Sequence, residues 1–599
     1  MESNVKNIIE KYSNDKTRLM DILTDIQTEN GFIHTEAVDE IASLLKISNV
    51  DVEQTLSFYQ FFTDKPRGKY QIYLNNSAVA NMMGRAEIAK TFEEEVGNRF
   101  DDANQDGKIG LYSTACIGMS DQEPSAIING KVFTQLTVDK VKSIVTDMKN
   151  GKSIDDMNIE FGDGQNAFKL VKSMVLNNIR KRGKVLFSEY NPAEGLKKAL
   201  SMTPDEVIEE VKKSTLRGRG GAGFPTGLKW DFCRRSEGEA HYVLCNADEG
   251  EPGTFKERVL LTEYPQLVFE GMIIAGYAID ANKGILYLRK EYAYLQEYLE
   301  HILQKLRDEN LLGNNIAGKD GFNYDIRIQF GAGSYICGEE SALIESAEGK
   351  RGEPRNRPPF PVQKGYLDQP TVINNVETLC SVVKIIQHGS EWFTMMGSKE
   401  SAGTKLLSIS GDCKYPGVYE VEWGARVRDV LKLAGAEEDI QAVQIGGPSG
   451  ECVSPKDFKR NISFEDLPTG GSLIIIGKQR NLLKDIVANF TEFFIEESCG
   501  SCVPCRALTV IMKNKLDKIL IGKGVKSDLT DLEDWGAKMK VSNRCGLGQT
   551  AANPILTTLK NFREKYEELL IKDKEFETGF DLEAAVAESC EVVGRTPNL

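Results

Sequence analysis

Three cysteines lie close together near the C-terminus, at the spacing of a metal-binding segment. Cys499, Cys502 and Cys505 form C-x-x-C-x-x-C, and Cys545 follows later in the chain. Three thiolates at this spacing can hold three corners of a cubic cluster, and a fourth cysteine from elsewhere completes the set. We therefore predict a [4Fe–4S] cluster bound by these four residues. A tetrahedral zinc site and the absence of any metal stay alternatives, although zinc sites usually pair two separated C-x-x-C arms.

A second segment that could bind a ligand is the loop 216–230, which contains five glycines. Its sequence matches G-x-G-x-x-G, but residues 204–214 before it predict a helix instead of the strand that a Rossmann fold requires. We therefore expect a loop of another fold whose backbone N–H groups approach a phosphate or a flavin, with a flexible turn as the simpler alternative. The glycines of the match are Gly218, Gly220 and Gly223, and the side chains that could supply charge or stack on a ring are Arg219, Lys229, Phe224 and Phe232.

Two further loops place acids beside small residues. Residues 246–253 (NADEGEPG) follow a strand-like segment, which puts their acids at a strand end, where ligands of α/β proteins tend to bind. Residues 331–340 (GAGSYICGEE) end in the pair Glu339 and Glu340. Such acids could bind ribose or ribityl hydroxyls or tune a flavin, whereas a single acid is more often a solvated surface group.

The composition excludes some classes of function. The chain has 599 residues and a formal net charge of −15, so nucleic acid is not expected as a partner. No apolar run approaches the ~20 residues of a membrane span, and the first residues lack the apolar core of a signal peptide. We therefore expect a cytoplasmic protein. In that compartment, clustered cysteines indicate metal or redox chemistry rather than disulfides.

The elements that must position these residues belong to a chain of several domains. Residues 1–65 predict amphipathic helices, and helices alternate with short apolar strands over 196–395, which indicates an α/β layer. We predict a multidomain α/β and α+β fold. Its divisions are a helical and sheet domain at 1–150, a linker at 151–195, an α/β domain with the glycine-rich loop at 196–395, a small α+β domain at 396–480, a helical bundle with the cysteines at 481–575, and a tail at 576–599.

These loops, the segment Asn374-Asn375-Val376-Glu377-Thr378 and the four cysteines occur in one order that resembles a known family. The family is that of the NADH-binding flavoprotein (diaphorase) subunits of respiratory complex I and of soluble NAD-linked hydrogenases and formate dehydrogenases, and the resemblance covers about 196–570. It implies FMN, NAD(H) and one [4Fe–4S] cluster, with a β-grasp domain at 396–480. The FMN site would comprise Gly218, Arg219, Gly220, Gly221, Lys229, Asn246, Asp248, Glu249, Gly338, Glu339, Asn374 and Asn375. NADH would lie over the flavin near Phe224, Phe232, Glu251, Tyr335, Glu340 and Arg357, the last standing where the family has a lysine.

Residues 1–150 are similar to a second component of complex I, a small thioredoxin-like subunit that carries a [2Fe–2S] cluster. That family places its four cysteine ligands as C-x₄-C and C-x₃-C. The matching positions here are Asn75, Ala80, Cys116 and Ser120. Because a cluster of this kind needs four ligands, we predict that the fold is kept and the [2Fe–2S] cluster is absent.

The activity that the resemblance implies is hydride transfer between NAD(H) and FMN and single-electron transfer to the cluster, because a flavin exchanges electrons in both ways. Lys229, Glu251 and Glu340 are expected at the reaction as positioning residues, since hydride transfer needs no acid–base group. The resemblance is greatest to the NADH-binding subunit of an electron-bifurcating iron-only hydrogenase, which predicts a hetero-oligomer with an iron–sulfur electron-carrier subunit and that hydrogenase. A formate dehydrogenase, complex I and a non-catalytic relay scaffold stay alternatives, and Arg357 leaves NADPH open as the reductant.

Overall fold

The computed structural model describes residues 4–102, 107–157, 160–436, 438–571 and 582–596, and it begins with a group of helices. As expected, apolar residues at helical spacing form their buried faces. This group packs on the α/β domain, because its apolar faces share a core with Leu343 and Ile344. The helices are α1 (Val5–Lys11), α2 (Leu19–Asn30), α3 (Thr35–Leu45) and α4 (Asn49–Phe58).

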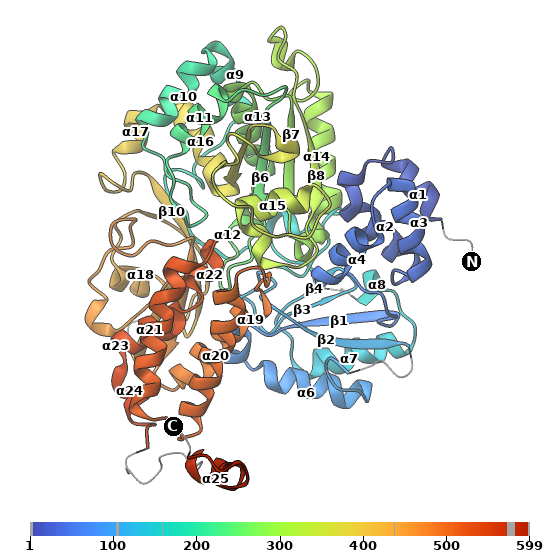
Figure 1. The fold of residues 1–599 in the computed structure, drawn as a ribbon. Coiled ribbons are helices and arrows are strands. Elements are labelled where there is room, and N and C mark those ends of the chain that lie inside the picture. The colour runs from blue at the N-terminus through green and yellow to red at the C-terminus, as the bar shows by residue number, and fades with distance from the viewer. Residues whose placement is uncertain (1–3, 103–106, 158–159, 437, 572–581, 597–599) are drawn as a thin grey trace.

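A four-stranded sheet follows in the order β2-β1-β3-β4. The two longer strands are parallel, and β3 and β4 form an antiparallel hairpin on the far side of β1. Helices α6 and α7 contact each other and lie along one side of this sheet (Figure 1). The elements are β1 (Tyr70–Asn75), α5 (Ala78–Met82), α6 (Arg85–Val96), β2 (Ile109–Thr114), β3 (Ala126–Ile128), β4 (Lys131–Phe133) and α7 (Val138–Lys149).

The α/β domain is built on a parallel sheet of order β8-β7-β6-β9. Because the strands are parallel, their carboxyl ends meet at one edge, and the acid-bearing loops that follow β6 and β8 lie there together with the end of β9. The glycine-rich loop runs between two helices, α10 (Pro204–Lys213) and α11 (Thr226–Arg235), which confirms that a helix and not a strand precedes it. The strands are β6 (Tyr242–Ala247), β7 (Lys283–Leu288), β8 (Asp325–Phe330) and β9 (Thr371–Asn375).

Helices cover this sheet, and α13 is buried along nearly its whole length, where it contacts β6 and β7 of the sheet and the neighbouring α16. Its continuous apolar sequence explains this position, since only a helix that is hydrophobic all round is stable inside a core. The helices are α9 (Glu194–Ser201), α10 (Pro204–Lys213), α11 (Thr226–Arg235), α12 (Lys256–Glu263), α13 (Pro265–Ile279), α14 (Gln296–Asp308), α15 (Glu340–Ala347), α16 (Val376–His388) and α17 (Ser390–Thr394).

The small α+β domain contains a six-stranded sheet of order β13-β12-β14-β10-β11-β5. The sequence pattern predicts four of these strands, but it misses the two short ones, β13 and β5. Strand β5 lies in the expected linker 151–195 and pairs in parallel with β11, so part of that segment belongs to this sheet. The elements are β5 (Ile179–Lys181), β10 (Thr404–Gly411), β11 (Gly417–Glu422), α18 (Val427–Leu433), β12 (Ile440–Ile445), β13 (Glu451–Val453) and β14 (Ser472–Gly477).

The buried carboxylate of Glu420, on β11, fixes the segment that follows β5. Its two oxygens accept hydrogen bonds from the backbone N–H groups of residues 183, 185, 186 and 187 at 2.9–3.0 Å, and from the hydroxyl of Thr404 at 2.7 Å. A buried charge is stable only when it is bonded in this way. The linker is therefore anchored to the sheet.

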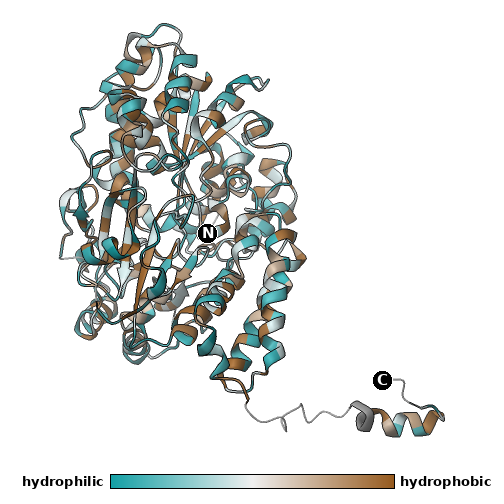
Figure 2. Cartoon of the chain, turned by 90° about the vertical axis from the view of Figure 1, so that its left-hand side faces the viewer, coloured by the Kyte–Doolittle hydropathy of each residue, from teal (hydrophilic) through white to brown (hydrophobic). Residues whose placement is uncertain are grey.

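The C-terminal part is a helical bundle in which α20 and α21 form a hairpin, as the cysteine spacing requires. Beyond the bundle, α25 (Leu582–Val593) stands apart from the rest of the chain (Figure 2). No helix in the described ranges has the length and apolar content to cross a bilayer. The division of the chain into separate folding units stays a prediction. The bundle helices are α19 (Ala488–Glu496), α20 (Val503–Leu520), α21 (Lys526–Ser542), α22 (Gly546–Thr550), α23 (Asn553–Asn561) and α24 (Arg563–Glu567).

Candidate functional site

A cavity of about 460 Å³ lies at the carboxyl edge of the parallel sheet, within the usual size of a ligand pocket. Three predicted segments line it: the glycine-rich loop, the acids after β6, and the loop after β8. Two turns of the small α+β domain and helix α22 complete the wall. The predicted site residues on the lining are Gly220, Gly221, Asn246, Asp248, Glu249, Glu251, Tyr335, Gly338, Glu339 and Asn375.

The glycine-rich loop approaches the cavity with its backbone. Gly221 has φ of +129°, a conformation that side-chain-bearing residues rarely adopt, and a Cβ on Gly220 would come within 3.3 Å of Asn375. The loop is closed by the Gly218 N–H, which donates to the Phe224 carbonyl at 2.9 Å. The backbone of the loop is therefore close to the cavity, as the sequence predicts for a loop that binds a phosphate or a flavin.

The Arg219 side chain does not lie where the sequence predicts its charge, at the ligand. Its guanidinium is buried away from the cavity, donates to the Ala402 carbonyl at 2.7 Å, and lies over the rings of Trp423 and Phe393. Burial lowers the pKa of Arg219 to about 10. The side chain therefore joins the α/β domain to the small α+β domain, and only the backbone of this residue belongs to the loop surface.

Two of the cavity acids are buried in contrasting ways. The Oδ2 atom of Asp248 has no hydrogen-bond partner within the described ranges, and burial raises its pKa well above the usual range. The Glu249 carboxylate accepts from the Tyr292 hydroxyl at 2.9 Å and from the Glu257 N–H at 3.0 Å. Burying a carboxyl oxygen without a hydrogen bond is costly, which is the physical reason for the raised pKa of Asp248.

On another wall, Glu251 meets the small α+β domain. Its carboxylate accepts hydrogen bonds from the Tyr335 hydroxyl and from both the N–H and the hydroxyl of Ser449, the latter two at 2.9 and 3.1 Å. The motifs in the sequence do not predict this contribution, although residues 446–450 (GGPSG) and 468–471 (PTGG) are glycine-rich turns of the kind that line ligand sites. The cavity is therefore shared between two domains.

The remaining predicted residues form the rim or the support of the cavity. Lys229 donates to Glu340 at 2.7 Å, and Glu340 also pairs with Arg357 at 3.2 Å, so one acid lies between two cations. These cations lower the pKa of Glu340 against the opposing effect of burial. The Asn374 side chain accepts from the indole N–H of Trp230 at 2.8 Å and is buried behind the lining. Phe224 and Phe232 are about half exposed and lie outside the lining.

The four cysteines come together where α20 and α21 bring the chain back on itself. Asn543 joins the two ligand segments, because its Oδ1 accepts from the Cys505 N–H at 3.0 Å while its Nδ2 donates to the Gly548 carbonyl at 2.9 Å. Burial raises the pKa of Cys545 to about 11, and Cys499 and Cys505 contribute electrostatically. In the described part of the chain, no three His, Cys, Asp or Glu side chains are grouped closely enough to hold a single metal ion. The cluster prediction therefore rests on the donor set and its spacing.

Three families of known proteins match successive parts of the chain. The matches are thioredoxin-like [2Fe–2S] ferredoxin over residues 5–149, the Nuo51 FMN-binding domain over 211–384, and the iron–sulfur binding region of the NADH-ubiquinone oxidoreductase F subunit over 485–569. The α subunit of the NAD-reducing hydrogenase HoxS from Cupriavidus necator is 50% identical over 589 residues, with 98% of each chain covered.

The chain belongs to the family of NADH-binding flavoprotein subunits of NAD-reducing hydrogenases and complex I. The expected resemblance, the mixed multidomain fold and the assignment to oxidoreductase subunits are thereby confirmed. A crystal structure of an NAD⁺-reducing [NiFe]-hydrogenase in the H₂-reduced state is also similar, with a TM-score of 0.86, 35% identity and 98% of both chains covered. The F subunit of NADH-quinone oxidoreductase from Aquifex aeolicus is 42% identical over 62% of this chain and 88% of its own length.

In this flavoprotein subunit, the positions that match the [2Fe–2S] ligands of the thioredoxin-like family are packed with other side chains. The Asn75 amide donates to Glu123, Ala80 is fully buried in α5, and the Cys116 thiol contacts the Ser120 hydroxyl at 3.5 Å. Burial raises the pKa of Glu123 to about 8. Hydrogen bonds and packing occupy the positions where the related family has thiolates.

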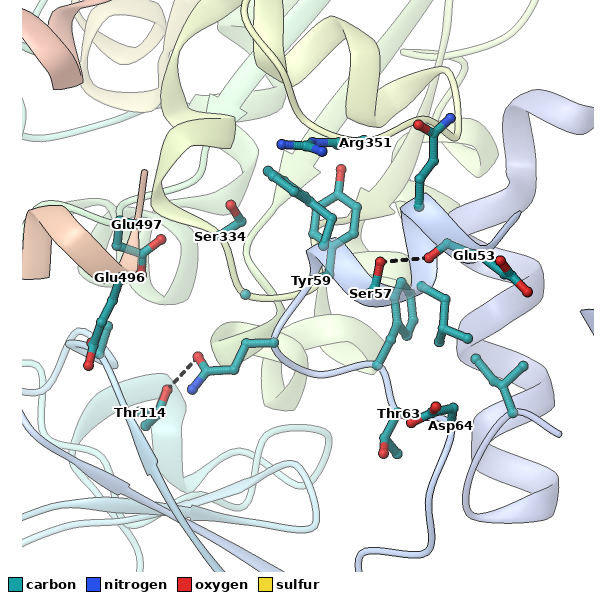
Figure 3. A pocket seen from close by; sticks show the side chains of 18 of the residues that line it. Glu53, Ser57, Tyr59, Thr63, Asp64, Thr114, Ser334, Arg351, Glu496 and Glu497 are labelled. Atoms are coloured by element: carbon teal, nitrogen blue, oxygen red, sulfur yellow. Dashed lines mark hydrogen bonds between the residues drawn. The ribbon is translucent and has the colours of Figure 1, made fainter. Parts of the chain in front are cut away.

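The flavoprotein subunit has a larger cavity, of about 1060 Å³, between the N-terminal helices, the N-terminal sheet and the cluster loop. Figure 3 shows Tyr59 and Arg351 on one side of it and Glu496 and Glu497 on another. Cys499 lies at its edge, and Gly333 and Ser334 of the loop after β8 line it, but no residue of the glycine-rich loop 216–230 does. The predicted cofactor residues converge on the smaller cavity instead.

Proposed function

We propose that this flavoprotein subunit transfers hydride between NAD(H) and FMN and passes single electrons to a [4Fe–4S] cluster. One observation carries the proposal. The cavity lined by the glycine-rich loop and the buried acids is closed by Gly546, Leu547 and Thr550 of α22, which begins immediately after Cys545. The proposed cluster ligand Cys545 is therefore adjacent in the chain to one wall of the proposed flavin cavity.

The residues that line the cavity fit FMN, which would supply the exchange between paired and single electrons. Gly220 and Gly221 leave space at the loop, and Asp248 lines the cavity while its Oδ2 atom is buried without a hydrogen-bond partner in the described part of the chain. The backbone of Arg219 and the residues Gly218, Lys229 and Asn374 would support the FMN site. The residues that we assign to its lining are Gly220, Gly221, Asn246, Asp248, Glu249, Gly338, Glu339 and Asn375.

For the nucleotide, we propose the wall that contains Glu251 and Tyr335 and the rim that contains Lys229, Glu340 and Arg357. Arg357 is already paired with Glu340, which makes it a partner of that acid as well as a candidate phosphate contact. Phe224 and Phe232 are exposed beside the rim and remain the proposed stacking residues. Glu251, Lys229 and Glu340 act by positioning, since hydride transfer needs no proton relay.

Cys499, Cys502, Cys505 and Cys545 are the proposed ligands of the [4Fe–4S] cluster, because four thiols on two joined segments form a complete donor set. We propose further that the N-terminal domain binds no [2Fe–2S] cluster. Among its four candidate positions only Cys116 is a thiol, and it is fully buried. The domain would then serve as a structural or docking part of the subunit.

We propose that the flavoprotein subunit works in a hetero-oligomer with an iron–sulfur electron carrier and a hydrogenase. The solved structures with the same extent are named as NAD⁺-reducing [NiFe]-hydrogenases, so we now favour a nickel–iron partner over the iron-only enzyme expected from the sequence. A subunit of an NADP-reducing hydrogenase from Solidesulfovibrio fructosivorans is 43% identical over 62% of this chain and 78% of its own length, which keeps NADPH as a reductant to test. Electron bifurcation, a formate dehydrogenase partner and a cytoplasmic location stay predictions.

The test is a reduction experiment on the anaerobically purified full chain supplied with FMN. Addition of NADH is expected to bleach the flavin absorbance within the mixing time of a stopped-flow instrument and to support reduction of benzyl viologen. A parallel sample with NADPH measures the preference between the two reductants. A folded, iron-containing chain that neither binds flavin nor oxidises NADH would contradict the proposal and favour the relay scaffold.

A further inference from the structure

The turn of residues 446–450, between β12 and β13, encloses the carboxylate of Glu251. The Ser449 N–H donates to Oε1 at 2.9 Å, and the Ser449 hydroxyl donates to Oε2 at 3.1 Å. The same hydroxyl lies 3.1 Å from the hydroxyl of Tyr335, which itself donates to Glu251. Ser449 thus contacts both residues that we assign to the nucleotide wall.

The close approach of the turn to Glu251 depends on a glycine, Gly447. Gly447 has φ of +64°, and a Cβ at this position would lie 2.5 Å from Oε1 of Glu251. The absence of a side chain at Gly447 is therefore what allows the turn to approach the carboxylate. Such close approach is a recurrent reason for glycine in a binding loop.

The turn is held from behind by the bundle that carries the cluster ligands. Asn553, at the start of α23, donates from Nδ2 to the Ser449 carbonyl at 2.6 Å. Strand β13, which follows the turn, packs against the same helix, and Asn561 donates to the Cys452 carbonyl at 2.7 Å. The helical bundle therefore holds Ser449 through Asn553, while Ser449 holds Glu251 of the α/β domain.

We propose that Ser449 is a positioning residue for the nucleotide, which holds the Glu251 carboxylate and the Tyr335 hydroxyl in one arrangement from the small α+β domain. This inference rests on the proposed function. Without the Ser449 hydroxyl, Glu251 keeps the Ser449 N–H and the Tyr335 hydroxyl as donors but loses one bond, and Tyr335 loses its second partner. The pair is then held less tightly, and the nucleotide must order it when it binds. Since this cost falls on the ground state and the transition state alike, it raises KM and leaves kcat nearly unchanged.

The experiment measures NADH-dependent benzyl viologen reduction by the full chain with FMN and cluster in place. For Ser449→Ala we expect a KM for NADH about tenfold higher and a kcat within about twofold of the unmodified chain, since one hydrogen bond to a charged group contributes about that factor. Ser449→Thr keeps the hydroxyl and is expected to restore KM to within about threefold. Gly447→Ala, which displaces the carboxylate with Ser449 intact, is expected to raise KM in the same direction.

The matched control is Ser410→Ala, because the Ser410 hydroxyl is buried on β10 of the same domain and has no hydrogen-bond partner in the described part of the chain. Its KM is expected to stay unchanged. Equal KM values for the unmodified chain, Ser449→Ala and Gly447→Ala, at unchanged flavin content, would overturn the assignment of Ser449. An unmodified chain that does not oxidise NADH would instead overturn the proposed function, so the two failures are distinct.

Discussion

Two regions of the molecule correspond to iron–sulfur sites in related proteins, and they differ in what stands at the ligand positions. In the bundle, Cys499, Cys502, Cys505 and Cys545 are all present, and Asn543 joins their two segments. In the N-terminal sheet domain, the corresponding places hold Asn75, Ala80, Cys116 and Ser120. The strands and helices around that site persist nonetheless. We propose that the N-terminal fold persists without the cluster, because hydrogen bonds and packing fill the places of the ligands.

The largest expected effect is that of removing one ligand in the bundle. Cys502→Ala should reduce benzyl viologen reduction with NADH at least a hundredfold and lower the iron content, because three thiolates cannot complete the cluster. Flavin bleaching by NADH should persist, since the cavity is separate from the thiol. Cys413→Ala, a half-buried cysteine outside the cluster segments, is the control and should change neither value. Full iron content in Cys502→Ala would contradict the ligand assignment.

The second prediction concerns the residue that joins the ligand segments. Asn543→Ala removes the acceptor of the Cys505 N–H and the donors to the Met539 and Gly548 carbonyls. Buried groups left without partners cost about 1–3 kcal/mol each, so the midpoint of chemical unfolding should fall and iron should dissociate faster in the presence of a chelator. Asn561→Ala, in the same bundle but away from the cysteines, should leave the rate of iron loss unchanged. Equal rates of iron loss for both variants would break the link between Asn543 and the cluster.

The third prediction tests the buried acid of the N-terminal site. Burial raises the pKa of Glu123 from 4.5 to about 8, so the folded chain binds a proton that the unfolded chain releases between these values. Raising the pH through this window should lower the free energy of unfolding by about 1.4 kcal/mol per unit, as the slope for one proton. Glu123→Gln should remove that contribution, which urea unfolding at several pH values can measure. Identical pH dependence in both proteins would show that Glu123 ionises normally.

The smallest expected effect is that of the remaining thiol in the N-terminal site. Cys116→Ala removes one buried sulfur atom and its contact with Ser120, so a loss of about 1 kcal/mol in the free energy of unfolding is expected. Iron content and NADH oxidation should equal those of the unmodified chain. A loss of iron here would overturn the proposal that this domain binds no cluster, and it would erase the difference between the two regions.

Much of the architecture follows from local pattern in the sequence. Helical periodicity predicts the helices within residues 1–65, where α1–α4 lie. Strand-like segments at 70–74, 108–112, 125–128, 241–245 and 284–289 predict β1, β2, β3, β6 and β7, and further segments predict four strands of the small α+β sheet. Parallel strands explain why residues 246–251 and 335–339, far apart in the chain, line one cavity. The need for a fourth ligand also predicts that Cys545 lies near the other three cysteines.

What the sequence does not reveal depends on contacts between distant segments. Strand β5 has only three residues, and its pairing with β11 across more than two hundred residues is what makes it a strand. Arg219 turns inward because Ala402 and Trp423, from the next domain, receive its guanidinium. Ser449 gains its place at the cavity only through Glu251 and Asn553. No local pattern contains these relations.

The pairing of β5 with β11, together with the bonds to Glu420, has a consequence for how such a chain could be divided between two genes. A break just before the α/β domain, near residue 196, would place β5 on a different polypeptide from β11. The four backbone donors to the buried Glu420 carboxylate would then belong to that other polypeptide. A break between α7 and β5, within residues 150–178, would leave that carboxylate bonded. We therefore expect a two-gene arrangement of this subunit to place residues 179–187 at the beginning of the larger polypeptide.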